Sequence, residues 1–262
     1  MDWEKELYSS PDERPLERLV GAYSNTSSFR SIAFIGDSLS SGEFESLGDD
    51  GKKGYHDLFE YSWGQYIARK NGLKAYNFSR GGMTAKEYME SFAEKRGFWS
   101  TDLACQAYVV ALGVNDVMNA KMEIGSIDDI DPDDWHNNKP TFVGYYAQII
   151  ARIKEEIQPD AKFFFVTMMH HDESPERDER RRAHAEALYA LAKYFSNAYV
   201  IDLYRYGPTV HAGFREAFYL YGHLNPMGYL LIGKMVDSYI DYLIRHNPDD
   251  FRRIPYIGTE WK

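Results

Sequence analysis

The chain has 262 residues, of which 44% are hydrophobic and 27% are charged, and its formal net charge is −10 at pH 7. This length and composition suit one globular domain with a full hydrophobic core. The acidic balance argues against a nucleic-acid partner, because binding to a phosphate backbone needs a basic surface. The single cysteine, Cys105, excludes an intrachain disulfide, and its place just before an apolar run indicates a packing role.

The sequence also gives no sign of membrane association. Its apolar runs fall well short of the about 20 residues that a membrane-spanning helix needs. The first six residues are mostly charged and lack the apolar core of a signal peptide. We therefore expect a cytoplasmic location, with secretion as the alternative if a signal peptide preceded this sequence.

Apolar, strand-like runs alternate along the chain with longer amphipathic stretches. The expected strands are residues 31–36, 74–78, 107–112, 162–168 and 198–203. The expected helices are residues 63–71, one starting near 84, 141–158, 175–195 and a last one after Pro226. This alternation predicts an α/β fold with three α/β/α layers, in which about five parallel strands form a flavodoxin-like, doubly wound sheet. The domain should cover residues 31–246, between an N-terminal extension (1–30) and a C-terminal tail (247–262).

Four short segments carry residues suited to chemistry, and three of them directly follow an expected strand. They are residues 36–40 (GDSLS), 77–84 (NFSRGGMT), 113–116 (GVND) and 223–229 (HLNPMGY). Each one alone could be an ordinary turn or helix cap. Ligands bind beyond the carboxyl ends of strands in an open parallel sheet, so we expect the segments to meet there.

With these four segments in this order, the chain resembles the SGNH (GDSL-like) hydrolases over about residues 31–236. The resemblance implies that Ser38 is the nucleophile and His223 the general base. It also implies an oxyanion hole made by the backbone N–H of Ser38, the N–H of Gly82 and the side-chain amide of Asn115, with Gly81 as the alternative register for Gly82.

These residue types suit acyl transfer on chemical grounds as well. A hydroxyl is a poor nucleophile until a base within ~3 Å takes its proton. The negative charge of the tetrahedral intermediate needs neutral donors already in place, and an asparagine amide is such a donor.

One position departs from the family pattern. The family normally carries an aspartate three residues before the histidine, where this chain has Leu220. Three interpretations stay open. A backbone carbonyl near Leu220 accepts from the imidazole, a carboxylate such as Asp202 or Glu216 does so, or catalysis has been lost.

Further residues near the motifs are candidates for lining the substrate site. They are Asp37, His170, His171 and Tyr221. The segment from His170 to Glu173 could also bind a metal, but adjacent histidines on a loop often point apart, and we expect no metal there. Aromatic residues between the motifs could stack on sugar rings or pack in the core.

We therefore predict an esterase without cofactor that hydrolyses small acyl esters, preferably acetyl esters of carbohydrates, through an acyl-serine intermediate. The catalytic group is a Ser-His dyad, or a triad with a non-standard acid. The partner is a small ester substrate, and the oligomeric state stays open. The alternatives are a non-catalytic carbohydrate-binding or scaffold domain and a lipid-acting lipase or phospholipase. The acidic loops expected at residues 42–54 and 123–140 argue against the apolar lid of a lipase.

Overall fold

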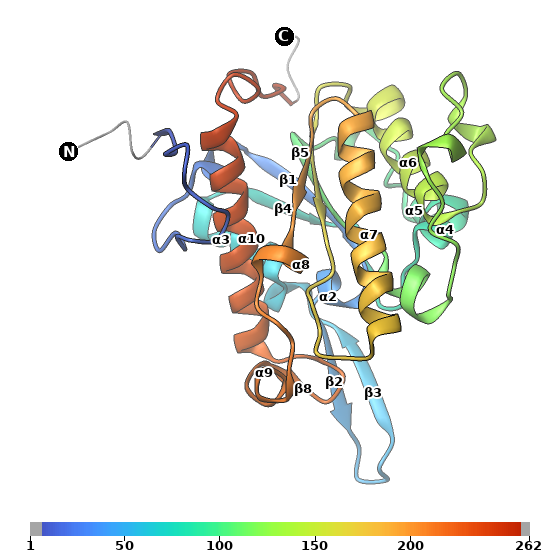
Figure 1. Ribbon diagram of the computed structural model, residues 1–262, viewed down its shortest axis with the longest axis vertical. Helices are drawn as coiled ribbons and strands as arrows, with labels where there is room; N and C mark the ends of the chain where they lie inside the picture. The colour runs from blue at the N-terminus through green and yellow to red at the C-terminus, as the bar shows by residue number, and fades with distance from the viewer. Residues whose placement is uncertain (1–6, 258–262) are drawn as a thin grey trace.

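The computed structural model describes residues 7–257 (Figure 1). The outer ends of both predicted extensions, residues 1–6 and 258–262, lie outside the described residues. A central sheet has five parallel strands in the order β4-β1-β5-β6-β7. These strands are β1 (Ser31–Gly36), β4 (Lys74–Asn77), β5 (Ala107–Ala111), β6 (Lys162–Val166) and β7 (Ala198–Ile201). Taken along the chain this is the order 2-1-3-4-5, so the predicted flavodoxin-like sheet is confirmed.

The inner strands β1, β5 and β6 are apolar on both faces because the sheet separates two cores. In β1, Ile32 and Phe34 pack into one core, while Ala33 and Ile35 pack into the other. Successive side chains of a strand point to opposite faces, so a parallel strand covered on both sides is an unbroken apolar run. This pattern is why the sequence revealed these strands clearly.

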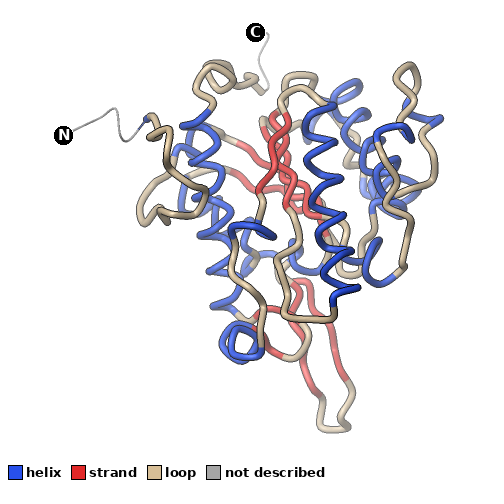
Figure 2. The backbone as a smooth tube through the Cα atoms, viewed as in Figure 1, coloured by secondary structure: helices blue, strands red, loops and turns tan. Residues whose placement is uncertain are grey.

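Helices cover both faces of the sheet, which gives the predicted three layers (Figure 2). One face is covered by α3 (Trp63–Asn71) and α10 (Pro226–His246). The other is covered by α4 (Ala85–Glu87), η3 (Tyr88–Phe92), α5 (Ala93–Arg96), α6 (Phe142–Arg152), η8 (Ile153–Ile157) and α7 (Pro175–Tyr194). The helix expected over residues 141–158 is thus divided into α6 and η8.

Polar residues begin these helices where the sequence suggested. Ser62 caps α3 by accepting from the N–H of Gln65, and Gly72 ends that helix in the left-handed conformation at φ 66°. Asn225 caps α10, whose first residue is Pro226. Such caps fix where each helix starts, and the cap of α10 places its first turn directly after His223.

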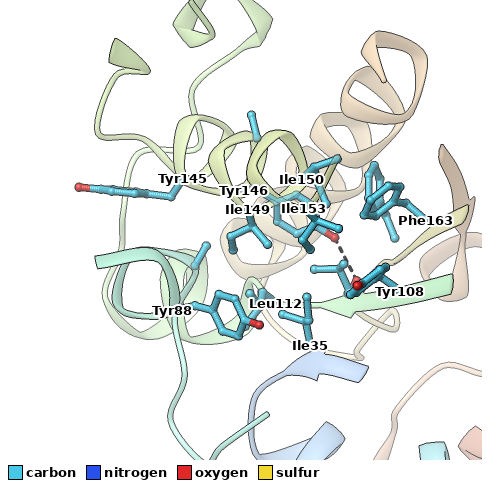
Figure 3. Packing of buried hydrophobic residues seen from close by; sticks show 14 of the residues in the cluster. Ile35, Tyr88, Tyr108, Leu112, Tyr145, Tyr146, Ile149, Ile150, Ile153 and Phe163 are labelled. Atoms are coloured by element: carbon cyan, nitrogen blue, oxygen red, sulfur yellow. Dashed lines mark hydrogen bonds between the residues drawn. The ribbon is translucent and has the colours of Figure 1, made fainter. Parts of the chain in front are cut away.

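The core beneath α6 shows how the layers are joined (Figure 3). Tyr108, Tyr146 and Phe163 are almost fully buried there. Burial of side chains of this size contributes about 1.5–3 kcal/mol each to stability. The hydroxyl of Tyr146 donates to the carbonyl oxygen of Val110 at 3.0 Å, so its polar atom is satisfied inside the core.

Two small antiparallel hairpins stand outside the central sheet. One pairs β2 (Glu43–Leu47) with β3 (Lys53–Asp57) and projects from the body of the molecule (Figure 1). The other pairs β8 (Tyr219–Leu220) with β9 (His223–Leu224). Residues 42–54 were expected to be an acidic loop, and this expectation is wrong for the segments that form β2 and β3.

The remaining elements are short helices. They are η1 (Asn25–Ser28), α2 (Ser38–Ser41), η2 (Phe59–Tyr61), η4 (Thr101–Leu103), η5 (Val114–Asn119), η6 (Ile127–Asp129), η7 (Trp135–Asn137), α8 (Leu203–Tyr206) and α9 (Ala212–Phe218). Of these, α2, η5 and α8 directly follow strands of the sheet, so they lie at its carboxyl edge.

Candidate active site

The turn after β1 presents Ser38 at the first position of α2. Asp37 caps this short helix, and its carboxylate accepts from the N–H of Leu39 at 3.0 Å. Gly36 is required by close packing, because a Cβ there would lie 2.2 Å from Oγ of Ser40. The chain therefore leaves the buried strand in one step, and Ser38 is left only half-buried at the sheet edge.

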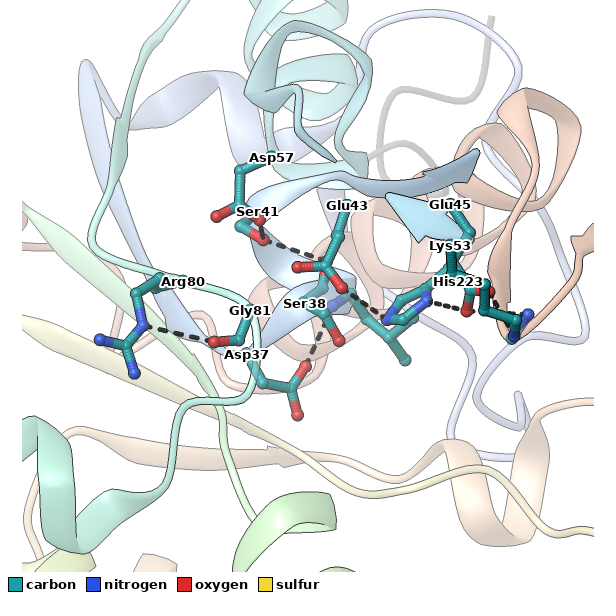
Figure 4. A network of polar contacts seen from close by, with 12 residues as sticks. Asp37, Ser38, Ser41, Glu43, Glu45, Lys53, Asp57, Arg80, Gly81 and His223 are labelled. Carbon is teal, nitrogen blue, oxygen red and sulfur yellow. Dashed lines mark hydrogen bonds and ion pairs between the residues drawn. The ribbon is translucent and has the colours of Figure 1, made fainter. Parts of the chain in front are cut away.

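His223 lies between two carboxylates of the projecting hairpin (Figure 4). Its Nδ1 atom is 2.7 Å from Oε1 of Glu45, and its Nε2 atom is 3.0 Å from Oε1 of Glu43. Both acids come from β2, where residues two apart point to the same face of the strand. The hairpin that projects from the body thus supplies both partners of the imidazole.

Glu45 is held as a buried, charged acceptor. Only 3% of its side chain is exposed. It also accepts hydrogen bonds from Nζ of Lys53 at 2.8 Å and from the N–H of Gly222 at 3.0 Å. Burial raises the pKa of the Glu45 carboxyl, but the hydrogen bonds from Lys53 and His223 outweigh this and leave the pKa below its ordinary value. Glu45 is therefore ionised at neutral pH, as an acid that orients an imidazole must be.

This arrangement corrects the expected partners of His223. Leu220 is the neighbour of His223 across the small hairpin, but the ring nitrogen Nδ1 faces Glu45 instead of a carbonyl there. Asp202 caps α8 by accepting from the N–H of Arg205 and also accepts from the hydroxyl of Tyr189. Glu216 is exposed on α9. The carboxylate that faces Nδ1 comes from a strand about 180 residues earlier in the chain, and the spacing of Glu43 and Glu45 was the one sequence feature that could have pointed to it.

The Nε2 side of His223 is occupied by Glu43. Among the hydrogen bonds of residues 7–257, none joins Ser38 to His223, and the group that faces Nε2 is the Glu43 carboxylate (Figure 4). A side chain at position 81 would collide with the Glu43 carboxylate, so Gly81 leaves room for it. Burial raises the pKa of the Glu43 carboxyl, with His223 acting in the opposite direction.

The loops after β4 and β5 lie together at the same edge and carry the predicted oxyanion donors. The side-chain amide of Asn115 donates to the carbonyl oxygen of Met83 at 3.1 Å and accepts from Asn119 at 2.7 Å. Gly82, next to Met83, has a φ of 74°, which a residue with a side chain rarely adopts. The contact therefore fixes Asn115 close to the glycine turn.

Two buried aspartates accept hydrogen bonds from backbone N–H groups in or beside the motif loops. Asp116 accepts from the N–H of Ala85 at 2.8 Å, and burial raises its pKa to about 6. Burial raises the pKa of Asp37 to about 7, with smaller contributions from the nearby charges of Asp116 and Glu43. Asp37 is buried and caps α2, and it also lines the small cavity described below, so its predicted place in the lining of the substrate site stays a prediction.

A small apolar cavity of about 90 Å³ lies behind the Ser38 turn. It is lined by Leu39, Val114, Met168 and Leu224, among others. Leu39, Val114 and Leu224 are the chain neighbours of Ser38, Asn115 and His223. The cavity therefore adjoins three of the four motif segments.

His170 and His171 belong to a separate polar cluster at the start of α7. Nδ1 of His170 is 3.1 Å from the hydroxyl of Thr209, and Nδ1 of His171 is 3.0 Å from Glu173. Burial and the charge of Arg181 lower the pKa of His171 to about 4. Within the described part of the chain, no three His, Cys, Asp or Glu side chains gather in a way that would hold a metal ion.

The motif segments of this site lie within a part of the chain that matches a known protein family. Residues 34–231, well over half of the chain, match the GDSL-like Lipase/Acylhydrolase family. The chain belongs to this family. It is accordingly a carboxylic ester hydrolase. No curated protein sequence matches the chain.

Solved structures of carbohydrate esterases share the fold of this acylhydrolase. A family two carbohydrate esterase from Clostridium thermocellum in complex with cellohexaose is 16% identical with a TM-score of 0.57, covering 88% of this chain and 66% of that one. A family two carbohydrate esterase with a carbohydrate-binding domain from Corynascus thermopiles (Myceliophthora fergusii) is 17% identical with a TM-score of 0.56, covering 82% and 66%. A carbohydrate acetylesterase from Sinorhizobium meliloti is 14% identical with a TM-score of 0.52, covering 82% and 99%.

The acylhydrolase spans about two thirds of the length of the two family two esterases. At these identities the likeness shows a shared fold. No helix within residues 7–257 combines the length and apolar character needed to cross a bilayer.

Proposed function

We propose that this acylhydrolase is a serine esterase that removes short acyl groups, preferably acetyl, from carbohydrates. Ser38 is the nucleophile, His223 the general base and Glu45 the acid that orients His223. The observation that carries the proposal is the 2.7 Å contact between Nδ1 of His223 and Glu45, beside the turn that presents Ser38.

The contact with Glu45 decides how the imidazole is used. When Nδ1–H donates a hydrogen bond to the ionised Glu45, the proton stays on Nδ1, and Nε2 is left as the proton acceptor. Nε2 of His223 takes the hydroxyl proton of Ser38 while the Oγ atom of Ser38 forms a bond to the ester carbonyl carbon. The charge of Glu45 then stabilises the imidazolium, which returns the proton to the leaving alcohol. Water releases the acyl group from Ser38 in the same way.

The negative charge of the tetrahedral intermediate falls on the former carbonyl oxygen. The donors for it are the backbone N–H groups of Ser38 and Gly82 and the side-chain amide of Asn115. Asn115 is already held by Met83 and Asn119, so its donor does not need to be ordered during the reaction.

Glu43 must leave Nε2 before Ser38 can use it. Its carboxylate lies 3.0 Å from Nε2, the ring nitrogen that has to accept the proton of Ser38. We propose that substrate displaces Glu43, whose side chain is 12% exposed and therefore borders solvent.

Two observations support short acyl groups and sugar alcohols as substrates. A cavity of about 150 Å³ holds benzene in a protein core, so the cavity of about 90 Å³ behind Ser38 suits acyl groups of only a few carbons. The carbohydrate half of the proposal is supported by the esterases that share the fold.

A panel of chromogenic esters from acetyl to decanoyl tests this function on the wild type and on Ser38→Ala together. We expect the acetyl ester to be the preferred one, and Ser38→Ala to lose about 10⁴-fold or more in kcat and all labelling by a fluorophosphonate probe. Turnover of the variant within about tenfold of wild type, a barrier change of only ~1.4 kcal/mol, would exclude Ser38 as the nucleophile. A wild type that neither reacts with the probe nor hydrolyses esters would favour a non-catalytic binding domain.

A further inference from the structure

Two exposed tyrosines flank His223 on the side that faces solvent. The ring of Tyr55, on β3, lies edge-on to the imidazole at a centroid distance of 6.1 Å. Tyr221 stands in the turn between β8 and β9, two residues before His223. Tyr55 is 57% exposed and Tyr221 is 53% exposed. Nζ of Lys53 is 5.9 Å from the Tyr221 ring and also pairs with Glu45, so one lysine links this ring to the catalytic acid.

The position of these rings relates to one half of the ester. The imidazolium of His223 must give its proton to the leaving alcohol, so that oxygen has to come within hydrogen-bond reach of Nε2. In the proposed function the acyl half lies toward the oxyanion donors and the apolar cavity, which Leu39 and Val114 line. The alcohol half of the substrate therefore extends from His223 over the surface that Tyr55 and Tyr221 border.

The backbone of Tyr221 gives a second, independent reason to connect it with function. Its φ is 58°, in the left-handed region that favours glycine or asparagine. The adjacent Gly222 is already required, because its N–H donates to Glu45 and a Cβ there would lie 2.3 Å from the Glu45 carboxylate. A tyrosine that is strained and half exposed is not explained by packing, and strained residues of this kind gather at functional sites.

The charges around the rings limit the kind of alcohol. Glu43, Glu45 and Asp57 lie on this side of the site, and Lys53 is already paired with Glu45. An anionic alcohol would be repelled, whereas the apolar C–H face of an uncharged sugar ring can pack on a tyrosine. We infer that Tyr55 and Tyr221 receive an uncharged pyranose ring in the alcohol half of the substrate. This inference rests on the proposed function and adds the residues that select the alcohol.

The test compares two acetyl esters that differ only in the alcohol, an acetylated hexose and ethyl acetate. Tyr221→Ala and Tyr55→Ala should each lower kcat/KM for the acetylated hexose by about tenfold, mainly through KM, because each removes about one ring contact. Both variants should lose far less activity on ethyl acetate, so that the preference for the acetylated hexose falls. Tyr221→Phe should keep most of the selectivity, since the ring is retained.

Tyr221→Gly separates binding from structural support. It should lose the same selectivity without lowering the melting temperature, because glycine relieves the backbone strain at φ 58°. Tyr23→Ala is the matched control, since Tyr23 is 76% exposed and precedes η1 and β1 at the opposite edge of the sheet. It should leave both reactions unchanged.

Four results would overturn the inference. Equal losses on both esters would mean that the tyrosines only support His223, and a lower melting temperature for Tyr221→Gly would mean the same for Tyr221. An unchanged kcat/KM of both tyrosine variants on the acetylated hexose would contradict the sugar site. Ser38-dependent hydrolysis of ethyl acetate would still support the proposed esterase function. Absence of any Ser38-dependent hydrolysis would overturn both proposals.

Discussion

The carboxyl edge of the central sheet and the β2–β3 hairpin contribute to the same site in different ways. The sheet edge carries Ser38, Gly82 and Asn115, in the loops that follow the buried strands β1 and β5 and the edge strand β4. The hairpin carries Glu43 and Glu45 and stands outside the central sheet, with Phe44 packed against the core under α10. His223, just before α10, is where the two regions meet.

The difference between the two regions concerns what fixes each side chain. Loops at the sheet edge are positioned by strands buried on both faces, so their geometry follows from the fold of the whole domain. The hairpin is positioned by a few contacts to the body, such as the packing of Phe44 on Tyr229, the hydrogen bond from the Tyr229 hydroxyl to the carbonyl oxygen of Glu43, and that from the Gly222 N–H to Glu45. The proposed acid is therefore positioned by different contacts from those that position the proposed nucleophile and oxyanion donors.

The largest expected effect in this comparison comes from the hairpin. Glu45→Gln should lower kcat by about 10³- to 10⁴-fold, because the amide no longer stabilises the imidazolium and can favour the wrong tautomer. Asp202→Asn is the matched control and should have little effect on activity, since Asp202 caps α8 instead of facing His223. The kcat of both variants on an acetyl ester decides this, and a larger loss for Asp202→Asn would contradict Glu45 as the acid.

A somewhat smaller effect is expected at the sheet edge. Asn115→Ala should lower kcat by about 10²- to 10³-fold with little change in KM, because the amide acts mainly on the charge of the transition state. Asn119→Ala, which removes only the residue that donates to Asn115, should have a much smaller effect. Steady-state kinetics with separate kcat and KM values test this, and a change confined to KM would make Asn115 a substrate-binding residue.

Glu43 should show that the two acids of the hairpin differ in role. Glu43→Gln replaces a charge-assisted contact at Nε2 by a weaker neutral one, so Ser38 should gain easier access to His223. We expect a severalfold rise in the rate at which a fluorophosphonate labels Ser38. Glu60→Gln, an exposed acid in η2, is the control and should leave the rate unchanged. A loss as large as that of Glu45→Gln would place Glu43 in the catalytic reaction itself.

The smallest effect concerns stability and not turnover. Folding raises the pKa of Asp37 from 3.8 to about 7, so the folded state binds more protons than the unfolded state between these values. Stability therefore falls as the pH rises across this window. Asp37→Asn keeps an oxygen that can cap α2 but cannot ionise, so its melting temperature should fall less between pH 4.5 and 7.5. Asp116, whose pKa is also raised, should leave part of the dependence in place. An unchanged pH dependence in Asp37→Asn would contradict the assignment.

The sequence alone determined the central sheet and the loops at its edge. The inner strands β1, β5 and β6 are almost continuous apolar runs, and the alternation of strands with helices predicts a parallel sheet. Ser38, Gly82, Asn115 and His223 stand in short motifs beside elements that the pattern already located. At these four residues the short local motif and the overall strand–helix pattern predict the same position at the edge of the sheet.

Only the tertiary structure decided the acid and the surroundings of His223. Glu45 lies 178 positions from His223 in the chain, in a hairpin whose strands mix acids with apolar residues and whose outer half is exposed. Such strands lack the apolar pattern that burial on both faces creates, so neither the hairpin nor its contact with β9 could be derived from periodicity. The pairing of Glu43 and Glu45 with one imidazole arises from how the hairpin packs on the β8–β9 turn, because that packing alone brings the three side chains within hydrogen-bond distance.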